Sequence, residues 1–310
     1  MKLSMADCSI HPYTGRGMDY RTAFTAIRDC GYTCIDYGIK ANLLEDDYKD
    51  HAKELKSLID ELGLTIPQAH APNPPKSEKP PIYYLANALR FCKEVGIPAV
   101  VVHPRCQSAS NTREEYFNFN VERFKSLIPY AEETGVTVLI ENIGNYFDSH
   151  FLYNGQELRK MVDAVDHPLV AACWDIGHAN HFEKKDCNQY DSIVALGEKL
   201  VAIHAHDNIG FFTDAAPKKR VDIHTMPYFS GMASVNWDEV LQALKDINYK
   251  GTFNFEISTP TPSSKRPDFV YNGEVVHTLE ILPLDVWKIF NKGIYETGRF
   301  MLESYGLYEE

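Results

Sequence analysis

VAACWDIGH, residues 170–178, is an apolar run that ends abruptly in Asp175 and, three residues later, His178. A carboxylate and an imidazole do not stabilise a buried strand end, because burying such groups costs free energy unless they are paired. They are expected where the end of a strand supplies ligands to an open binding site. The same form, an apolar run followed by a potential ligand, recurs at His70, His103, Glu141, His204 and Glu256. This recurrence predicts strands whose C-terminal ends meet around one site.

Short apolar runs alternate with helical periodicity along the whole chain. Strands are expected at 2–9, 33–37, 64–70, 98–103, 136–141, 170–175, 200–206 and 251–256. Helices are expected at 18–30, 47–62, 82–95, 112–134, 155–165, 191–200, 236–247 and 282–305. Alternating βα units imply a parallel sheet, and eight of them imply a closed (β/α)8, or TIM, barrel. An open doubly wound sheet is the competitor, but no GxGxxG follows the first strand.

The domain organisation follows from the same alternation, because no second block of different composition interrupts it. We expect a single α/β TIM-barrel domain over residues 1–310, with loop insertions at its C-terminal face. The barrel core is expected at about 2–258, a polar insertion at about 259–281 and a terminal helix at about 282–305.

The bulk composition restricts the classes of partner. The formal net charge is −12, with 43 acidic against 31 basic residues, so nucleic acid and anionic membranes are disfavoured as partners. Seven scattered cysteines without a CxxC pair indicate reduced thiols. No apolar run approaches the roughly 20 residues that span a bilayer. We expect a cytoplasmic protein, with a homo-oligomer as a possibility that the sequence leaves open.

The polar strand ends predict a metal centre. Several carboxylates in one cavity cost several kcal/mol unless a cation neutralises them. Four ligands from strands five to eight form a plausible Mn²⁺, Zn²⁺, Co²⁺ or Mg²⁺ site: Glu141, Asp175, His204 and Glu256. His206 is left out of this set, on the expectation that it points to the opposite face of its strand from His204.

Two further groups of residues are candidates for the same mouth. Asp222 and His224 form a D-x-H pair on an extended stretch and could reach a second cation or a substrate hydroxyl. Arg220, which ends a basic run, and Arg105, which follows His103-Pro104, could bind an anionic group such as a phosphate.

A set of short motifs resembles the xylose isomerase-like TIM-barrel superfamily over roughly Leu3–Ser258. These motifs are VVHP (101–104), IEN (140–142), DIGH (175–178), IHAHDN (203–208), GMASVNW (231–237) and FEIS (255–258). The superfamily contains sugar and sugar-phosphate isomerases and epimerases, inosose dehydratases, hydroxypyruvate isomerases and the endonuclease IV group. The resemblance implies that the four residues above bind the metal, that Glu141 and Glu256 are the acid/base pair, and that His178 holds substrate hydroxyls.

The endonuclease branch of this superfamily introduces an alternative with three zinc ions. Its ligands match positions that all carry ligand-type residues here: His70, His103, Glu141, Asp175, His178, His204, Asp222, His224 and Glu256. Of these, His70, His103, His178, Asp222 and His224 are assigned to substrate binding or to a second metal. The acidic composition, and the lack of basic or aromatic loops of the kind that flip a nucleotide, weigh against a nuclease.

The leading hypothesis is therefore a divalent-metal-dependent sugar or sugar-phosphate isomerase or epimerase. It would transfer a proton between carboxylates through a metal-stabilised enediolate. The substrate is expected to be a sugar, a sugar phosphate or a polyol. The alternatives are a multinuclear zinc phosphodiesterase of the endonuclease IV type and an inosose dehydratase-type lyase. The exact substrate, its phosphorylation and the number of metal ions stay open.

Overall fold

The computed structural model describes residues 1–45, 48–75, 79–105, 112–143, 152–182, 184–210, 223–258, 270–275 and 281–310. Eight parallel strands form one sheet in the order β7-β6-β5-β4-β3-β2-β1-β8. They are β1 (Leu3–Ala6), β2 (Cys34–Gly38), β3 (Thr65–His70), β4 (Ala99–Val102), β5 (Thr137–Glu141), β6 (Val170–Asp175), β7 (Leu200–His204) and β8 (Phe253–Phe255). Consecutive strands are neighbours throughout, as the alternating βα pattern predicts.

The two ends of this sheet meet and close it into a barrel. Strand β8 pairs with β1 in parallel, with Leu3 opposite Phe253. On its other side, the N–H of Ala205 donates to the carbonyl of Asn254 at 2.7 Å, and the N–H of Glu256 donates to the carbonyl of Ala205 at 3.1 Å. The predicted (β/α)8 barrel is confirmed.

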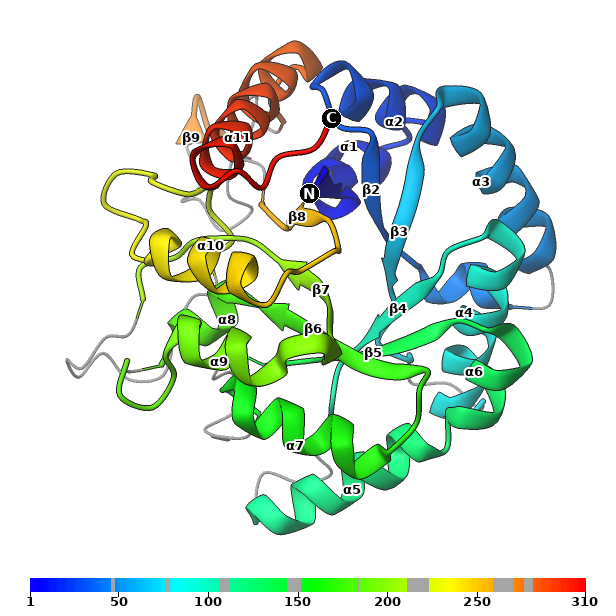
Figure 1. Ribbon diagram of the computed structural model, residues 1–310. Helices are drawn as coiled ribbons and strands as arrows, with labels where there is room; N and C mark the ends of the chain where they lie inside the picture. The colour runs from blue at the N-terminus through cyan, green and yellow to red at the C-terminus, as the bar shows by residue number, and fades with distance from the viewer. Residues whose placement is uncertain are drawn as a thin grey trace.

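Helices form the outer layer of the barrel (Figure 1). They are α1 (His11–Thr14), α2 (Tyr20–Asp29), α3 (Tyr48–Leu62), α4 (Pro81–Val95), α5 (Arg113–Lys125), α6 (Ile128–Thr134), α7 (Gly155–Val165), α8 (Ile176–Asn180), α9 (Gln189–Leu196), α10 (Trp237–Asp246) and α11 (Leu284–Tyr305). Short 3-10 helices lie at Asp7–Ile10, Ala41–Leu44 and Gly197–Lys199. None of the described helices has the length and apolar character needed to cross a membrane.

The helix expected over 112–134 is divided in two, which corrects the prediction. Helix α5 begins with a capping box between Thr112 and Glu115 and ends at Lys125, and α6 begins at Ile128. Pro129 lies in the first turn of α6. A proline inside a continuous helix would clash with the carbonyl four residues earlier, which belongs to Lys125, so the chain starts a new helix here.

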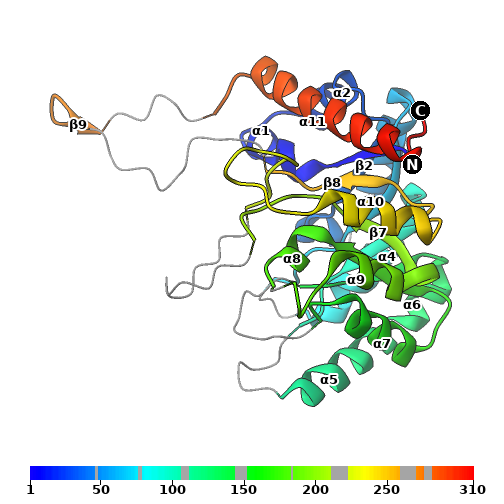
Figure 2. The same ribbon diagram turned by 60° about the vertical axis from the view of Figure 1, so that its left-hand side comes forward.

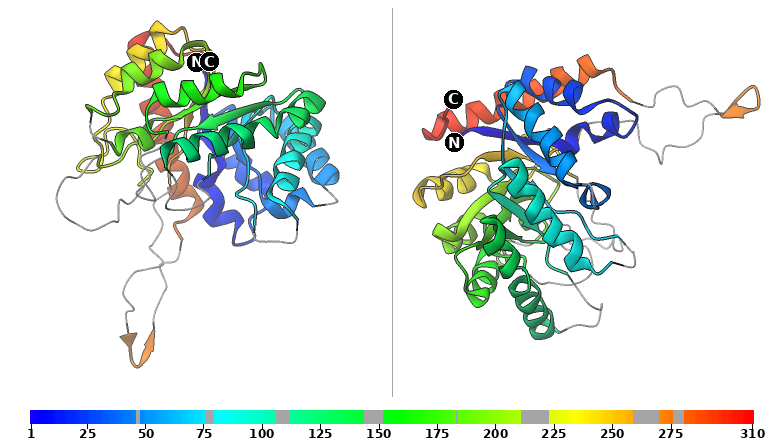
Figure 3. Two further views of the ribbon diagram at one scale, coloured as in Figure 1. Left: turned by 90° about the horizontal axis from the view of Figure 1, so that it is seen from below. Right: turned by 90° about the vertical axis from the view of Figure 1, so that its right-hand side faces the viewer.

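The chain termini and a two-stranded hairpin lie outside the eight-stranded sheet. The two termini lie side by side at one end, where the amino group of Met1 donates to the carbonyl of Leu307 (Figure 2). The hairpin of β9 (Val270–Tyr271) and β10 (Glu274–Val275) stands apart from the barrel (Figure 3). The insertion expected at 259–281 otherwise lies almost entirely outside the described residues.

Strand alternation decides which side chains reach the barrel interior. A small buried cluster, separate from the core beneath the helices, consists of Ala99, Val101, Leu139, Ala171, Cys173 and Ala202. Side chains two positions apart on a strand point to the same face. Glu141, Asp175 and His204 each lie two positions after a member of this cluster. The inward face of each strand therefore ends in a polar group at the C-terminal mouth.

Candidate metal centre

Four side chains converge at the C-terminal ends of β5, β6, β7 and β8. The ligand atoms of Glu141, Asp175, His204 and Glu256 all lie within 4.8 Å of one another. Nδ1 of His204 lies 3.2 Å from Oε1 of Glu141, 3.1 Å from Oε2 of Glu256 and 3.9 Å from Oδ2 of Asp175. The structure thus brings together the four residues predicted as the metal site.

Asn142 fixes the ends of β5 and β6 relative to each other. Its Oδ1 accepts from the N–H of Asp175 at 2.6 Å, and its Nδ2 donates to the carbonyl of Asp175 at 2.8 Å. Oδ1 of Asp175 in turn accepts from the N–H of His178 at 2.6 Å, which caps α8. The IEN motif supplies the side chain of this pair of hydrogen bonds, and the DIGH motif supplies the backbone.

The donor set fits a cation. Oδ2 of Asp175 is a buried oxygen without a hydrogen-bond partner among the described residues. Buried carboxylate oxygens of this kind are costly unless a cation or a donor meets them. Three carboxylates with one imidazole form a ligand set that Mn²⁺, Zn²⁺, Co²⁺ or Mg²⁺ can use. A divalent ion would therefore be held by the same four residues.

Electrostatics hold the carboxylates in their charged form even without a cation. Burial opposes ionisation of Glu141, but His204 and His103 keep the pKa of its carboxyl well below the ordinary value. Burial likewise opposes ionisation of Glu256, and contacts with His204 and His224 lower its pKa. The imidazoles around the site act as counter-charges to the carboxylates.

The imidazoles show the complementary shift. Burial acts to lower the pKa of His204, but Cys173, Glu256 and Glu141 raise it well above its usual value. Burial also opposes protonation of His70, and Glu141 raises its pKa to about 9. In the metal-free protein, protons on these rings therefore balance charge that a cation would balance when bound.

A second group of potential ligands shares Glu141. Oε2 of Glu141 lies 2.9 Å from Nε2 of His103 and 3.4 Å from Nε2 of His70, and the two ring nitrogens are 3.0 Å apart. The ligand atoms of these three residues also lie within 4.8 Å of one another. His70 and His103, predicted as substrate or second-metal residues, therefore lie beside the four-residue site.

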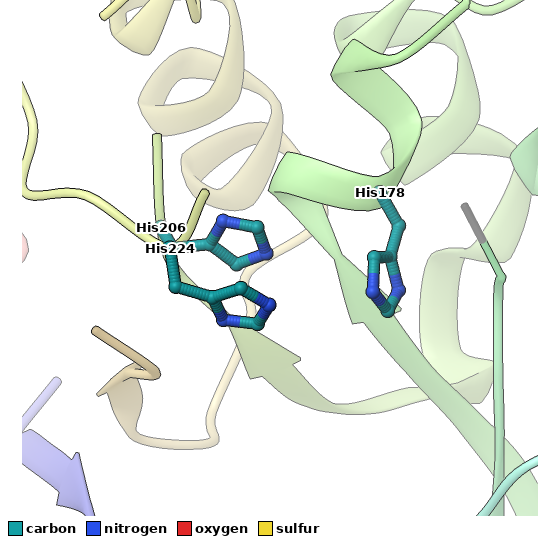
Figure 4. Close-up of side chains that lie close together, drawn as sticks. All are labelled: His178, His206 and His224. Carbon is teal, nitrogen blue, oxygen red and sulfur yellow. The ribbon is translucent and has the colours of Figure 1, made fainter. Parts of the chain in front are cut away.

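A third group consists of three imidazoles at the mouth, His178, His206 and His224 (Figure 4). The rings of His206 and His224 are stacked, with centroids 3.7 Å apart and planes 10° apart, and both face His178. Nε2 of His206 lies 3.1 Å from Oδ1 of Asp175, so this group adjoins the four-residue site. His178 and His224, which were predicted as substrate or second-metal residues, therefore lie together in this group.

His206 lies at the site although the sequence reasoning left it out. We expected it to face away from His204, and this is wrong, because side chains two positions apart on an extended strand lie on the same face. The H-x-H spacing of His204 and His206 was the signal that could have identified it. Its ring is fully buried and turned toward Asp175.

Gly177 of the DIGH motif makes room for the ring of His206. A Cβ at position 177 would lie 1.9 Å from Cε1 of His206. We expect Gly177→Ala to destabilise the protein by about 1–3 kcal/mol through overpacking, measured by chemical denaturation. Removal of the opposing ring in Gly177→Ala/His206→Ala should relieve the clash, so that the double variant loses less stability than the sum of the single variants. Additive losses would contradict this origin of the effect.

The loop after His206 is anchored by a buried carboxylate. Oδ1 of Asp207 accepts from the N–H groups of Ser234 and Val235 at 2.7 and 3.0 Å, and its Oδ2 accepts from Nε1 of Trp237 at 2.8 Å. Trp237 is 2% exposed, which identifies it as a packing residue. Asp207 thus holds three residues of the GMASVNW motif in place, which gives this motif a structural role.

A cavity of about 320 Å³ opens beside the ligands on the side of β1 to β4. Its wall includes Glu256, His70 and His103, together with Cys8 and Lys40. The side chain of Glu256 is 20% exposed, whereas that of Glu141 is 1% exposed. Glu256 is therefore the carboxylate of the four-residue site that a molecule in this cavity can touch.

Three further predicted residues are not members of these groups among the described residues. Asp222 and Arg220 fall outside the described residues. The N–H of Arg105 donates to Oδ1 of Asn120 at 2.8 Å, and Nδ2 of Asn120 donates to the carbonyl of Arg105 at 2.9 Å, which fixes the backbone after β4. Anion binding by Arg105 and Arg220 stays a prediction.

Comparison with known sequences shows the family. The sequence pattern of the xylose isomerase-like TIM barrel family matches residues 24–272. The chain belongs to this family, in agreement with the eight-stranded barrel and with the resemblance of its motifs.

Three curated relatives align with the chain at 24–27% identity. The uncharacterized protein MJ1311 of Methanocaldococcus jannaschii is 27% identical over 56% of this chain and 55% of its own length. The inosose isomerase of Bacillus subtilis is 25% identical over 56% and 58%, and the D-psicose 3-epimerase of Enterocloster bolteae is 24% identical over 75% of each. The chain thus spans little more than half the length of the first two.

Solved structures share the fold over nearly the whole chain. A crystal structure of D-psicose 3-epimerase in the presence of D-fructose superposes with a TM-score of 0.69 at 16% identity, covering 97% of this chain and 99% of the other. The crystal structure of the IOLI protein with a zinc atom gives a TM-score of 0.69 at 17% identity, with complete coverage of both chains. At these identities the likeness concerns the fold.

Proposed function

We propose that the protein is a divalent-metal-dependent sugar or sugar-phosphate isomerase or epimerase. The observation that carries this proposal is the convergence of Glu141, Asp175, His204 and Glu256 within 4.8 Å at the mouth of the barrel. The similarity to an inosose isomerase and to a D-psicose 3-epimerase supports it. A small polyhydroxylated molecule is the substrate class that fits a cavity of about 320 Å³ whose wall includes His70, His103 and Glu256.

The chain's own residues supply the proton transfer in this proposal. A divalent ion bound by the four residues would supply Lewis-acid stabilisation of a developing enediolate. Glu256, which lines the cavity, takes the proton from the substrate carbon as general base. Glu141, the second carboxylate of the pair, would act as the acid that returns a proton to the substrate. His178, whose ring faces those of His206 and His224, orients substrate hydroxyls by hydrogen bonding.

The first test is the metal content of the protein purified without chelator, determined per chain by elemental analysis. We expect about one equivalent of a divalent ion, held by the four-residue site. The variant His204→Ala should lose this ion, because it removes the only imidazole of the set. A wild-type protein that binds no ion, even after addition of Mn²⁺, Co²⁺ or Zn²⁺, would refute the proposal.

The second test is activity toward the proposed substrate class. We expect solvent deuterium to enter a ketose such as D-fructose or D-psicose, or an inosose, when the protein is incubated with it in heavy water. Comparison of free and phosphorylated sugars tests the proposed anion contact of Arg105 and Arg220. Elimination of water instead of epimerisation would identify the dehydratase alternative, since both reactions begin with the same proton abstraction.

One observation favours a second candidate, a multinuclear zinc phosphodiesterase. The four-residue site adjoins two further groups of potential ligands, His70–His103–Glu141 and His178–His206–His224. Two or three zinc ions per chain would make a hydrolase the leading function, with abasic-site DNA as the first substrate to try. The net charge of −12 and the similarity to isomerases and epimerases weigh against this candidate.

A further inference from the structure

Asp36, on β2, is a buried carboxylate that the proposed proton transfer does not use. It is 3% exposed and lies in the barrel interior, where apolar side chains usually form the packed layers. A carboxylate in such a place is costly unless donors surround it. Asp36 was not among the predicted site residues, although an aspartate that interrupts the apolar strand TCIDY is itself a signal.

The donors around Asp36 come from three different strands and meet at one oxygen. Oδ2 of Asp36 accepts from Nε2 of Gln68 on β3 at 2.9 Å and from Nδ2 of Asn254 on β8 at 2.9 Å. The same oxygen lies 3.1 Å from Nε2 of His204 on β7. The two amides therefore hold the carboxylate in place, with Oδ2 against the imidazole of the predicted metal ligand.

The two ring nitrogens of His204 face different groups. Nδ1 faces Oε1 of Glu141 and Oε2 of Glu256, at 3.2 and 3.1 Å. Nε2 lies 3.1 Å from Oδ2 of Asp36 and makes no hydrogen bond in the part of the chain that the structure describes, so this carboxylate oxygen is the acceptor placed to take its proton. A neutral imidazole with carboxylates on both sides has two possible tautomers. The nitrogen that donates its proton to a neighbouring group cannot bind a metal, whereas the other nitrogen keeps a free lone pair and can.

We propose that Asp36 is a positioning residue for the metal ligand His204. It holds the proton on Nε2 and orients the ring, so that the lone pair of Nδ1 points between Glu141 and Glu256. Metal-bound imidazoles usually donate their other N–H to a carboxylate or carbonyl in this way, and loss of that partner typically costs about 10–100-fold in metal affinity. The inference rests on the proposed metal-dependent function.

The experiment compares metal binding by the full-length wild type and by Asp36→Asn, each stripped with chelator and titrated with Co²⁺. Co²⁺ absorbs visible light in a way that reports ligand geometry. We expect Asp36→Asn to bind Co²⁺ about 10–100-fold more weakly, with a changed visible spectrum, while the far-ultraviolet circular dichroism is retained. An unchanged affinity and spectrum would overturn the positioning role.

Asp207→Asn is the matched control. Asp207 is also a buried carboxylate at the mouth, 1% exposed, but its hydrogen bonds go to the loop at 234–237 and not to His204. This variant should lower the midpoint of thermal unfolding and leave the Co²⁺ affinity unchanged. An equal loss of affinity in Asp207→Asn would attribute the effect in Asp36→Asn to general destabilisation and would overturn the inference.

A measurement on the wild type covers the case in which Asp36→Asn does not fold. Long-range ¹H–¹⁵N correlation spectra of the Zn²⁺-loaded protein, assigned with His204→Ala, should show His204 protonated at Nε2 and metal-bound at Nδ1. The reverse tautomer would overturn the role of Asp36 while leaving the metal-dependent function intact. A wild type that binds neither Co²⁺ nor Zn²⁺ would instead overturn the proposed function itself, and the inference with it.

Discussion

Glu256→Gln is expected to abolish turnover with little loss of fold. The substitution keeps the size of the side chain and removes the carboxylate that accepts the proton from the substrate carbon. General acid–base catalysis of this kind contributes about 10²–10⁴-fold, and the loss of one metal ligand adds to the effect. Glu256 is the most exposed carboxylate of the site, with 20% of its side chain exposed, and lines the cavity, so a substrate there meets it directly.

The measurement is the rate of deuterium incorporation from heavy water into the best ketose or inosose of the screen. Glu61→Gln is the matched control, because Glu61 is an exposed carboxylate that pairs with Arg21 on the outer surface. The control should keep the wild-type rate, and both variants should unfold within a few degrees of the wild type. A near-normal rate in Glu256→Gln would remove Glu256 from the proposed mechanism.

The barrel was predictable from the sequence because strand-like and helix-like patterns of apolar residues alternate regularly along the chain. Apolar runs of strand length alternate with helical stripes, and each strand of the parallel sheet pairs with its neighbour in sequence. The strand Val170–Asp175 and the helix Gly155–Val165 have the predicted bounds. The helix over 112–134 was predicted without its break, although Pro129, whose ring cannot continue a helix, was a signal for it.

The four-residue site was predictable because its members share one feature, a polar residue at the end of an apolar strand. His206 follows the end of β7 in the same way and was missed through an error about strand geometry. Asp36 and Gln68 were missed for another reason. They lie within strands, and only the closure of the barrel brings β2, β3, β7 and β8 around one imidazole. No spacing along the chain contains that information.

The affinity for the metal ion is expected to rise steeply with pH. The pKa of His204 is raised well above its usual value: burial opposes this, but Cys173, Glu256 and Glu141 outweigh it. Below that pKa, a proton occupies Nδ1, the nitrogen that faces the carboxylates, and an ion can bind only by displacing it. Each displaced proton makes the affinity about tenfold higher per pH unit, so the change from pH 6 to pH 8 should be about 100-fold.

The affinity is expected to rise with pH because the pKa of His204 is raised and not lowered. Because the pKa of His204 is raised in the metal-free protein, metal binding releases a proton throughout the neutral range. An imidazole that was already neutral at pH 7 would release none. Competition with a chelator of known affinity at pH 6, 7 and 8 measures the slope, and calorimetry in buffers of different ionisation enthalpy counts the protons. A slope of zero would show that His204 is not protonated in the metal-free site.

A second ion, if it binds between His70, His103 and Glu141, has a different upper limit. The pKa of His70 is about 9, since Glu141 raises it against the effect of burial. The affinity for that ion should therefore rise up to about pH 9 and level off above it. His70→Ala should abolish this second phase and leave the first unchanged, because His70 is not among the four ligands of the first site. A wild type that already shows a single phase, unchanged in His70→Ala, would mean that only the four-residue site binds metal.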